Sequence, residues 1–431
     1  MQIVKFPAKS EWASFLERPH RDASELRETV KTVLDDIQAR GDVAVKEYEL
    51  KFDKVQLDSL QVSEAELQEA ETLVSDELKQ ALTLAHHNIE KFHASQKFEG
   101  RKVETAPGVV CWQKSVAIEK VGLYIPGGTA PLFSTVLMLA TPAKIAGCKE
   151  IVLCTPPNRE GKVNPAILMA ARIAGVSKIF KAGGVQAIGA MAYGTESVPK
   201  VSKIFGPGNQ FVMAAKQQVS LHEVAIDMPA GPSEVAVVAD DSANPVFVAA
   251  DLLSQAEHGA DSQAVMFTDS LALAEAVDAE VAKQLEKLPR KELASKSLEY
   301  SKLIVVKNLD EVIDICNEYA PEHLILAVKD YMTVAERVVN AGSVFLGNYS
   351  CESAGDYASG TNHTLPTSGY AKAYSGVNLD SFCRKITFQE LTAEGIRSIG
   401  RAVEVMAENE QLDAHKNAMT VRLLEVQGCS K

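Results

Sequence analysis

Residues 121–154 read VGLYIPGGTAPLFSTVLMLATPAKIAGCKEIVLC, and this stretch decides the fold. It opens with the apolar run Val121–Ile125 and closes with a second apolar run, Ile151–Cys154. The segment TVLMLATPAKIAG between them is helix-like. A short apolar strand, a helix and another apolar strand are typical of a parallel sheet that is covered on both faces. The stretch therefore predicts an α/β fold.

The same alternation of strands and helices continues from Ala117 to Asn348. Each apolar run is followed by a helix-like segment, and the number of runs fits two doubly wound parallel sheets. We therefore predict two incomplete Rossmann-like domains, with a seam at Asp227–Glu234, where Pro and Gly cluster. The remaining strand-like runs are Lys178–Phe180, Glu234–Ala239, Ala264–Thr268, Leu303–Val306, Leu324–Val328 and Ser343–Gly347.

The sequence on either side of this region is helical. The first helix stops at Gly41, and Ser63 has the character of a helix cap before EAEL. We therefore expect two small, mainly helical accessory domains besides the two large ones. The expected boundaries are an N-terminal segment that packs on the large domains (1–29), a helical domain (30–116), two Rossmann-like domains (117–230 and 231–370) and a C-terminal helical domain (371–431).

Composition excludes several classes of protein. The formal net charge of −13 argues against a nucleic-acid binder, because phosphate contacts need a basic face. No apolar run reaches the roughly 18 residues of a membrane span, and the first residues contain no signal-peptide core. The seven cysteines are scattered without a CxxC pair. We therefore expect a cytoplasmic protein with reduced thiols, no membrane partner and no nucleic-acid partner.

Two pairs of residues in the second half of the chain have types that bind metals or move protons. Gln255 and His258 are three residues apart at the end of a predicted helix and would share one face of it. Glu322 and His323 are adjacent, so both side chains reach one pocket only at a loop or an element end, which Pro321 favours. Taken singly, each pair is more often a solvated surface feature than a site.

Two further segments carry candidates of the same kind. Asp356 and His363 lie in the stretch 349–376, which we expect to be a functional loop because it is too polar and glycine-rich for a helix. Glu410 and His415 lie near the C-terminus. Together the segments supply a Gln oxygen, two His nitrogens and an Asp oxygen, a donor set suited to a divalent metal with open positions. Their spacing alone does not assemble them into one site.

The sequence resembles the histidinol dehydrogenase family from about residue 20 to residue 425. The resemblance rests on eight motifs in the order that the family has them. They are GLYIPGGTAPLFSTVLMLATPAKIAGC, GGVQAIGAMAYGT, KIFGPGNQFV, DMPAGPSE, DLLSQAEHG, APEHL, SAGDYASGTNHTLPT and DAHKNAMTVR.

The resemblance implies a cytoplasmic enzyme that uses zinc and NAD to oxidise L-histidinol through L-histidinal to L-histidine, at the end of histidine biosynthesis. It implies that domain 117–230 binds NAD and that domain 231–370 holds the metal and the substrate. One Zn²⁺ per subunit would be bound by Gln255, His258, Asp356 and His415. These residues would also contact substrate, together with Ser233, His323, His363 and Glu410. NAD would contact Tyr124, Gln186 and Asn209, and the catalytic pair would be Glu322 and His323.

These residue types suit the chemistry that the resemblance implies. Hydride leaves a carbinol carbon only as the hydroxyl proton is removed, and His323 is a base of suitable pKa. Histidinal must then be hydrated, and Glu322 would take a proton from the attacking water. Zinc would mainly position the imidazole and amine of the substrate. The family also implies a homodimer with exchanged segments, in which Glu410 and His415 complete the partner's site.

The expected cofactor site departs from the usual dinucleotide fingerprint. No strand is followed by GxGxxG and then an acidic ribose partner. The turns GGVQAIG and FGPGNQ carry glycines between a strand and a helix, and would admit phosphates at a helix N-terminus. The NAD assignment therefore comes from the resemblance.

Two other readings compete with this one. A zinc hydrolase would use Glu322 to activate water and need no nicotinamide, and the metal donors fit it equally well. A related dehydrogenase would act on another amino alcohol or a diol, although Ser233, His323 and Glu410 together favour histidinol. A requirement for NAD separates the hydrolase from the dehydrogenases.

Overall fold

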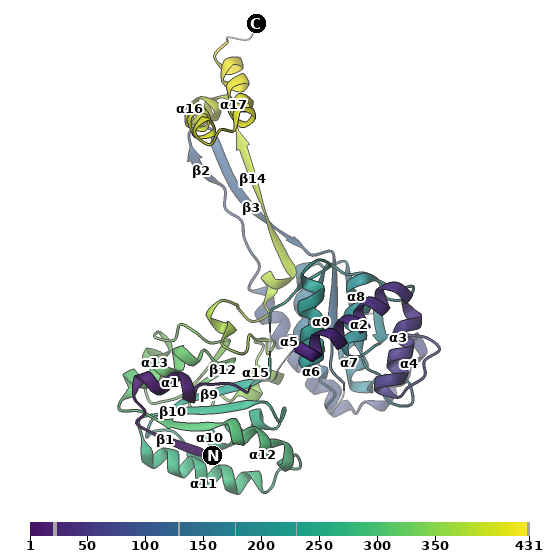
Figure 1. Ribbon diagram of the computed structural model, residues 1–431, viewed down its shortest axis with the longest axis vertical. Helices are drawn as coiled ribbons and strands as arrows, with labels where there is room; N and C mark the ends of the chain where they lie inside the picture. The colour runs from purple at the N-terminus through teal and green to yellow at the C-terminus, as the bar shows by residue number, and fades with distance from the viewer. Residues whose placement is uncertain (20–23, 128–129, 177, 230, 429–431) are drawn as a thin grey trace. The chain divides into compact units, whose positions relative to one another are not determined.

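The computed structural model describes residues 1–19, 24–127, 130–176, 178–229 and 231–428. The chain divides into two compact units (Figure 1). Unit 1 contains residues 1–96 and 118–382, and unit 2 contains residues 97–117 and 383–431.

The first sheet of unit 1 has five parallel strands in the order β6-β5-β4-β7-β8. Its central strands are almost wholly buried, which explains their continuous apolar sequence. The strands are β4 (Lys120–Tyr124), β5 (Glu150–Thr155), β6 (Lys178–Lys181), β7 (Lys203–Phe205) and β8 (Ala225–Ile226), and the helices are α6 (Phe133–Ala146), α7 (Pro165–Ile173), α8 (Gly184–Tyr193) and α9 (Gln210–Ser220).

The N-terminal helices pack onto this first sheet and its helices. Helix α2 contacts α8 and α9, and its buried side chains Val30, Leu34 and Ile37 join the core formed with Ile188 and Met191. Ser63 caps α4 through a capping box, as expected. The elements are α2 (Ser24–Arg40), α3 (Asp42–Tyr48), the π-helical turn η2 (Glu49–Asp53), α4 (Glu64–Leu73) and α5 (Asp76–Ala94).

The second sheet has six parallel strands in the order β1-β11-β10-β9-β12-β13. Helices α10 and α11 supply the core on one face, and α13 and α1 supply it on the other (Figure 1). The strands are β9 (Glu234–Ala239), β10 (Gln263–Thr268), β11 (Lys302–Val305), β12 (His323–Ala327), β13 (Ser343–Leu346) and β1 (Gln2–Lys5), and the helices are η1 (Lys9–Glu11), α1 (Trp12–Phe15), α10 (Pro245–Ala256), α11 (Leu271–Leu285), α12 (Lys291–Tyr300), α13 (Leu309–Tyr319) and α14 (Tyr331–Ala335).

The two sheets share one topology. If the strands β4 to β8 of the first sheet are numbered 1 to 5, and likewise β9 to β13 of the second, both sheets have the order 3-2-1-4-5. This is the Rossmann order without its sixth strand. The second sheet adds β1 beside β11. The predicted α/β class with two incomplete, doubly wound parallel sheets is therefore confirmed.

The stretch 349–376 corrects one expectation, because it contains a helix. Helix α15 (Glu352–Tyr357) forms despite the polar sequence, followed by the short turns η3 (Tyr370–Lys372) and η4 (Leu379–Phe382). Gly355 fits there because a Cβ atom would lie only 2.5 Å from the ring of Phe345. A larger side chain at this position of the helix would therefore collide with the ring.

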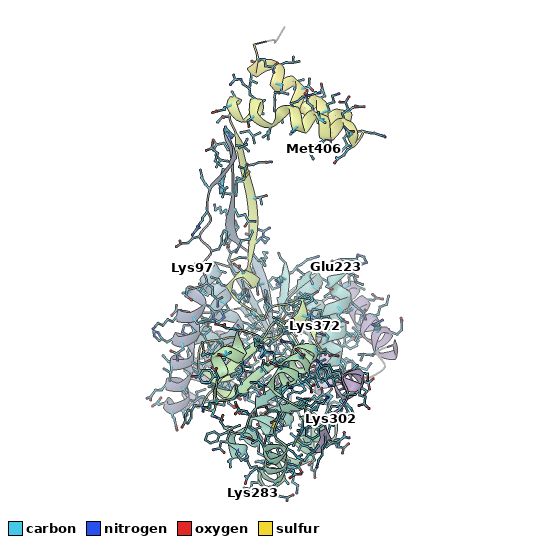
Figure 2. All side chains as sticks on the ribbon, turned by 90° about the vertical axis from the view of Figure 1, so that its left-hand side faces the viewer. Lys97, Glu223, Lys283, Lys302, Lys372 and Met406 are labelled. Carbon is cyan, nitrogen blue, oxygen red and sulfur yellow. The ribbon has the colours of Figure 1, made fainter. Side chains whose placement is uncertain are left out.

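Unit 2 combines an antiparallel sheet with a helical pair. Strand β14 pairs with β3 over nine residues, and the rings of Trp112 and Phe388 stack between them with centroids 5.4 Å apart. The unit thus draws on residues that we had assigned to helical domains 30–116 and 371–431, while 30–96 and 371–382 belong to unit 1. Its elements are β2 (Val103–Ala106), β3 (Val109–Ala117), β14 (Cys383–Leu391), α16 (Ala393–Asn409, which carries Met406 in Figure 2) and α17 (Asp413–Val426).

Among the helices of the described residues, none combines the length and the apolar character that crossing a bilayer requires.

Candidate functional site

Glu322 and His323 lie where β12 begins, at the amino edge of the second sheet. Ala320 adopts a left-handed backbone conformation (φ 52°) that ends α13 and turns the chain into this strand. Both side chains are buried, and Oε2 of Glu322 lies 3.7 Å from Nδ1 of His323. Oε2 of Glu322 also accepts a hydrogen bond of 2.8 Å from the N–H of Glu234, the first residue of β9. The pair therefore sits at an element end, where adjacent side chains can share a pocket.

Helix α15 brings two more carboxyl groups to this imidazole. Oε1 of Glu352 lies 3.8 Å from Nδ1 of His323, and Oδ1 of Asp356 lies 3.4 Å from Nε2. Glu352 and Asp356 are four residues apart and thus occupy one face of the helix. Three carboxyl groups consequently surround one histidine.

Burial makes two of the three acids hold their protons more tightly than usual. Burial raises the pKa of Glu322 and of Glu352 to about 8. Burial alone would lower the pKa of His323, but the carboxylates of Glu352, Glu322 and Asp356 raise it to about 10. Burial also acts to raise the pKa of Asp356, yet the adjacent imidazole of His323 holds it below its usual value. The cluster carries more acidic than basic groups, so it favours an additional positive charge.

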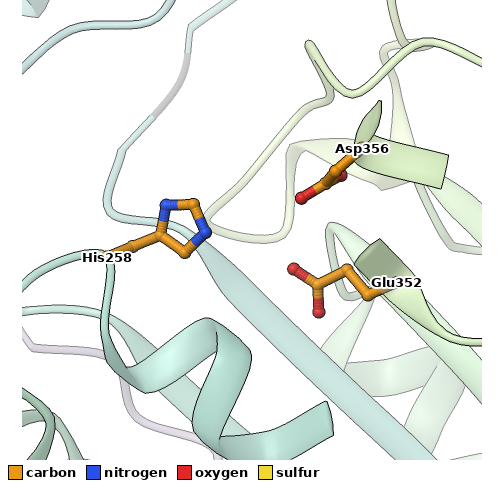
Figure 3. A group of neighbouring side chains, drawn as sticks. All are labelled: His258, Glu352 and Asp356. Carbon is orange, nitrogen blue, oxygen red and sulfur yellow. The ribbon is translucent and has the colours of Figure 1, made fainter. Parts of the chain in front are cut away.

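The cluster has the donors and the unmet polar atoms that a divalent cation requires. His258, Glu352 and Asp356 each offer a ligand atom within 4.8 Å of the others, and the imidazole of His258 faces the two carboxylates (Figure 3). Oε2 of Glu352 and Oδ1 of Asp356 are buried without a hydrogen-bond partner, and so are both polar atoms of Gln255. Buried polar atoms are nearly always paired, so this concentration of unpaired donors fits a metal ion.

Gln255 and His258 do not share a helix face, contrary to our expectation. Helix α10 ends at Ala256, and the chain closes a turn in which the N–H of His258 donates to the carbonyl oxygen of Gln255 over 3.2 Å. Gln255 is wholly buried, whereas His258 is exposed. The imidazole of His258 therefore points toward α15 because of this turn, and not because of the periodicity of a helix.

The remaining predicted substrate residues lie in different places. Ser233 directly precedes β9 and is half-buried. His363 joins two segments of unit 1, since Nδ1 lies 2.9 Å from the backbone oxygen of Asp356 and Nε2 lies 3.0 Å from Oγ1 of Thr135. Glu410 and His415 belong to unit 2, where both are exposed. The cluster of buried acids described above consists of residues of unit 1.

Glu352 is the member of the cluster that is not among the residues predicted from the sequence. Its only local signal is the spacing of four residues between Glu352 and Asp356, which places both on one face if the segment is helical. The sequence predicts a loop for this segment, and in a loop a spacing of four residues does not place two side chains on one face.

The three residues expected to contact NAD follow the carboxyl ends of strands in the first sheet. Tyr124 ends β4, while Gln186 and Asn209 follow β6 and β7. The order of the strands reverses between β4 and β7, which is where doubly wound sheets usually bind ligands. Nε2 of Gln186 donates to Oε1 of Glu49 over 2.8 Å and to Oδ2 of Asp53 over 3.2 Å. Two acids of η2 thus hold the Gln186 amide.

The amides that we expected to receive phosphates are already hydrogen-bonded within the protein. At α8, the N–H of Gly183 donates to Oε1 of Glu49 over 2.9 Å, and the N–H of Gly184 donates to the hydroxyl of Tyr124 over 3.2 Å. At α9, Oδ1 of Asn209 accepts from the N–H groups of Phe211 and Val212. A phosphate at either turn would have to displace these partners or use other groups.

Comparison with known proteins gives one consistent result. The sequence model of the family described as histidinol dehydrogenase matches residues 16–423. The histidinol dehydrogenase of Bacteroides thetaiotaomicron is 69% identical over 98% of this chain and 99% of its own length. That of Escherichia coli K12 is 54% identical over 95% of this chain and 94% of its own. The crystal structure of histidinol dehydrogenase from Elizabethkingia anophelis has a TM-score of 0.97 at 56% identity and covers 99% of both chains.

Proposed function

The chain belongs to the histidinol dehydrogenase family, and from this premise we propose that it oxidises L-histidinol with NAD, through L-histidinal, to L-histidine. The single observation that carries the proposal is the buried cluster of unit 1. It combines a histidine held among three carboxyl groups with a set of unpaired metal donors.

We propose that Gln255, His258, Asp356 and His415 hold one Zn²⁺ per subunit. The unpaired buried atoms of Gln255 and Asp356 and the orientation of His258 support the first three ligands. When bound, zinc would orient the imidazole and amine of histidinol and offset the negative charge that raises the pKa of His323. Glu352 lies close enough to the same donors to add to that negative charge.

His323 is the proposed base in both oxidations. In the first, it takes the hydroxyl proton of histidinol while hydride leaves the same carbon for NAD. Glu322 then takes a proton from the water that adds to the aldehyde, while protonated His323 returns its proton to the aldehyde oxygen. The neutral imidazole accepts the hydroxyl proton of the hydrate as the second hydride leaves for a second NAD. Both residues are buried, so a substrate carbon held against them would be shielded from bulk water. Ser233, His363 and Glu410 complete the proposed substrate contacts.

We further propose that NAD contacts Tyr124, Gln186 and Asn209 and that the enzyme acts as a cytoplasmic homodimer. In the dimer, Glu410 and His415 of one subunit would complete the site of the other. Their exposure on unit 2 supports this arrangement, because it leaves both side chains available to a second copy. Six of the cysteines are free thiols, which agrees with a reducing compartment.

The stoichiometry of NADH formation tests the proposal. With limiting L-histidinol we expect two NADH per substrate, lost on chelation and restored by zinc. One NADH per substrate would indicate a single oxidation that releases an aldehyde. No NADH from the zinc-replete protein would overturn the proposed function and favour the zinc hydrolase, in which Glu322 activates water without nicotinamide.

A further inference from the structure

The backbone of Glu234 contacts both residues of the proposed catalytic pair. Its N–H donates to Oε2 of Glu322 over 2.8 Å, and its carbonyl oxygen lies 3.3 Å from Nδ1 of His323. A proton on Nδ1 directed at this carbonyl leaves Nε2 as the nitrogen that can accept a proton. The position of one peptide segment therefore determines how both side chains are presented.

A buried ion pair fixes this segment. Nε and Nη2 of Arg18 donate to the two carboxylate oxygens of Glu234 over 2.6 and 2.9 Å, in a bidentate pair. Glu234 is buried, and the side chain of Arg18 is only 21% exposed. The N–H of Ser368 also donates to Oε1 of Glu234 over 2.8 Å. The carboxylate thus has partners from two other segments of the chain.

Arg18 also holds the segment that leads into the catalytic pair. Nη2 donates to the carbonyl oxygen of Tyr319 over 2.7 Å, and the guanidinium lies over the Tyr319 ring, 4.1 Å from its centroid. Tyr319 is the last residue of α13, three residues before Glu322. Arg18 therefore connects the first residue of β9 with the chain that enters β12.

We propose that Arg18 and Glu234 are positioning residues that orient Glu322 and His323 for the oxidation of histidinol. This inference rests on the proposed function. Arg18 acts at a distance from the reacting atoms, through the carboxylate of Glu234 and the carbonyl oxygen of Tyr319. A small displacement of either backbone segment changes the direction of the base, to which proton transfer is sensitive.

Three variants test the inference in the zinc-loaded full-length enzyme. We expect Arg18→Ala to lower kcat by about 10- to 100-fold, the loss typical of a misplaced catalytic group, while the KM values for histidinol and NAD change little. Arg18→Lys and Glu234→Gln keep a similar side-chain volume but lose the bidentate geometry. Their kcat values should therefore lie between those of Arg18→Ala and the wild type. Guanidinium ions at low millimolar concentration should restore part of the kcat of Arg18→Ala and leave Arg18→Lys unchanged.

The matched control is Arg337→Ala. Arg337 pairs with Asp310 over 2.7 Å at an exposed site, so its loss should leave kcat unchanged. Arg18→Ala with wild-type kcat, or with a lowered kcat that guanidinium does not raise, would overturn the inference. If Arg18→Ala does not fold, Arg18→Lys and Glu234→Gln provide the test: a lowered kcat in both would support the inference, and wild-type kcat in both would overturn it. Failure of the wild-type enzyme to oxidise histidinol would instead overturn the proposed function.

Discussion

Glu49 illustrates how a single buried carboxyl group affects the stability of the protein. Burial raises its pKa from an ordinary value of 4.5 to about 8, although the N–H of Gly183 and the amide of Gln186 act to lower it. The folded protein keeps a proton that the unfolded chain releases above pH 4.5. The stability that this proton contributes is complete below that pH and is lost as the pH rises toward 8.

The substitution Glu49→Gln should therefore flatten the pH dependence of unfolding. One group contributes a slope of up to about 1.4 kcal/mol per pH unit in this window. Urea unfolding at a series of pH values would measure the difference between wild type and variant. Glu28→Gln, at an exposed position on α2, is the control. Equal slopes for wild type and Glu49→Gln would show that Glu49 ionises normally.

Glu322 allows the two proposed oxidations to be separated. Because its proposed role is to take a proton from water in the hydration of the aldehyde, Glu322→Gln should spare the first hydride transfer and slow the second by about 10²- to 10⁴-fold. Rapid-quench analysis should then find one NADH per histidinol and an accumulated aldehyde. His323→Gln should impair both steps. Equal loss of both steps in Glu322→Gln would contradict the division of roles.

At the scale of elements, α15 joins the proposed metal donors to the packing of the second sheet. Gly355 lies between Glu352 and Asp356, and a methyl group there would approach two ring atoms of Phe345 to 2.5 and 2.8 Å. The helix or the ring must move to relieve this contact. We expect Gly355→Ala to lose zinc and activity several-fold, as measured by metal analysis after dialysis and by NADH formation.

A second substitution shows whether the ring is the cause. Phe345→Leu removes the clashing atoms, so the double variant Gly355→Ala/Phe345→Leu should retain more zinc than Gly355→Ala alone. Ser353→Ala, at an exposed position of the same helix, should bind zinc normally. A double variant as poor as the single one would mean that Gly355 is needed for its backbone and not for space.

The elements differ in how well their sequence reveals them. Strands of the two parallel sheets are buried on both faces, so they read as apolar runs, and β9 was predicted to the residue. Strands β3 and β14 are mostly half-buried or exposed and pair across a long sequence separation, so no local pattern marks them. Helix α15 has a polar, glycine-containing sequence that is atypical of a helix, and so Glu352 was missed.

The candidate site was recognisable from the sequence only through its resemblance to a family. Gln255 comes from the last turn of α10, His258 from the turn after it, His323 from the start of β12, and Asp356 from α15. Nothing in their spacing shows that these elements converge at one edge of a sheet. The type of each residue indicates that it could bind a metal or move a proton. The order of the strands and helices in the fold brings these residues close together.

For the whole molecule, the central question is whether His415 acts in its own subunit or in the partner subunit. We expect His258→Ala and His415→Ala each to be inactive as homodimers. If His415 serves the partner, a hybrid of the two variants contains one complete site. Random pairing should then restore about a quarter of the wild-type rate, because half of the dimers are hybrids with one working site each.

A mirrored hybrid provides the control for this experiment. Wild-type subunits paired with the double variant His258→Ala/His415→Ala have no complete site if His415 acts on the partner, and one complete site if it acts within its own subunit. Hybrids purified through two different affinity tags distinguish these outcomes. Activity in the mirrored hybrid and none in the first would contradict the exchanged arrangement.

The pairing of β1 with β11 has a consequence for biosynthesis on the ribosome. Residues 2–5 are synthesised about 300 residues before their partners, residues 302–305. At translation rates of about 5–20 residues per second, the N-terminal strand waits roughly 15–60 s for its neighbour. During that time its edge is open to other nascent chains. Slower translation between these two segments, for example by ribosome stalling at rare codons, prolongs this interval. It should therefore reduce the yield of soluble protein without altering the activity of the molecules that finish folding.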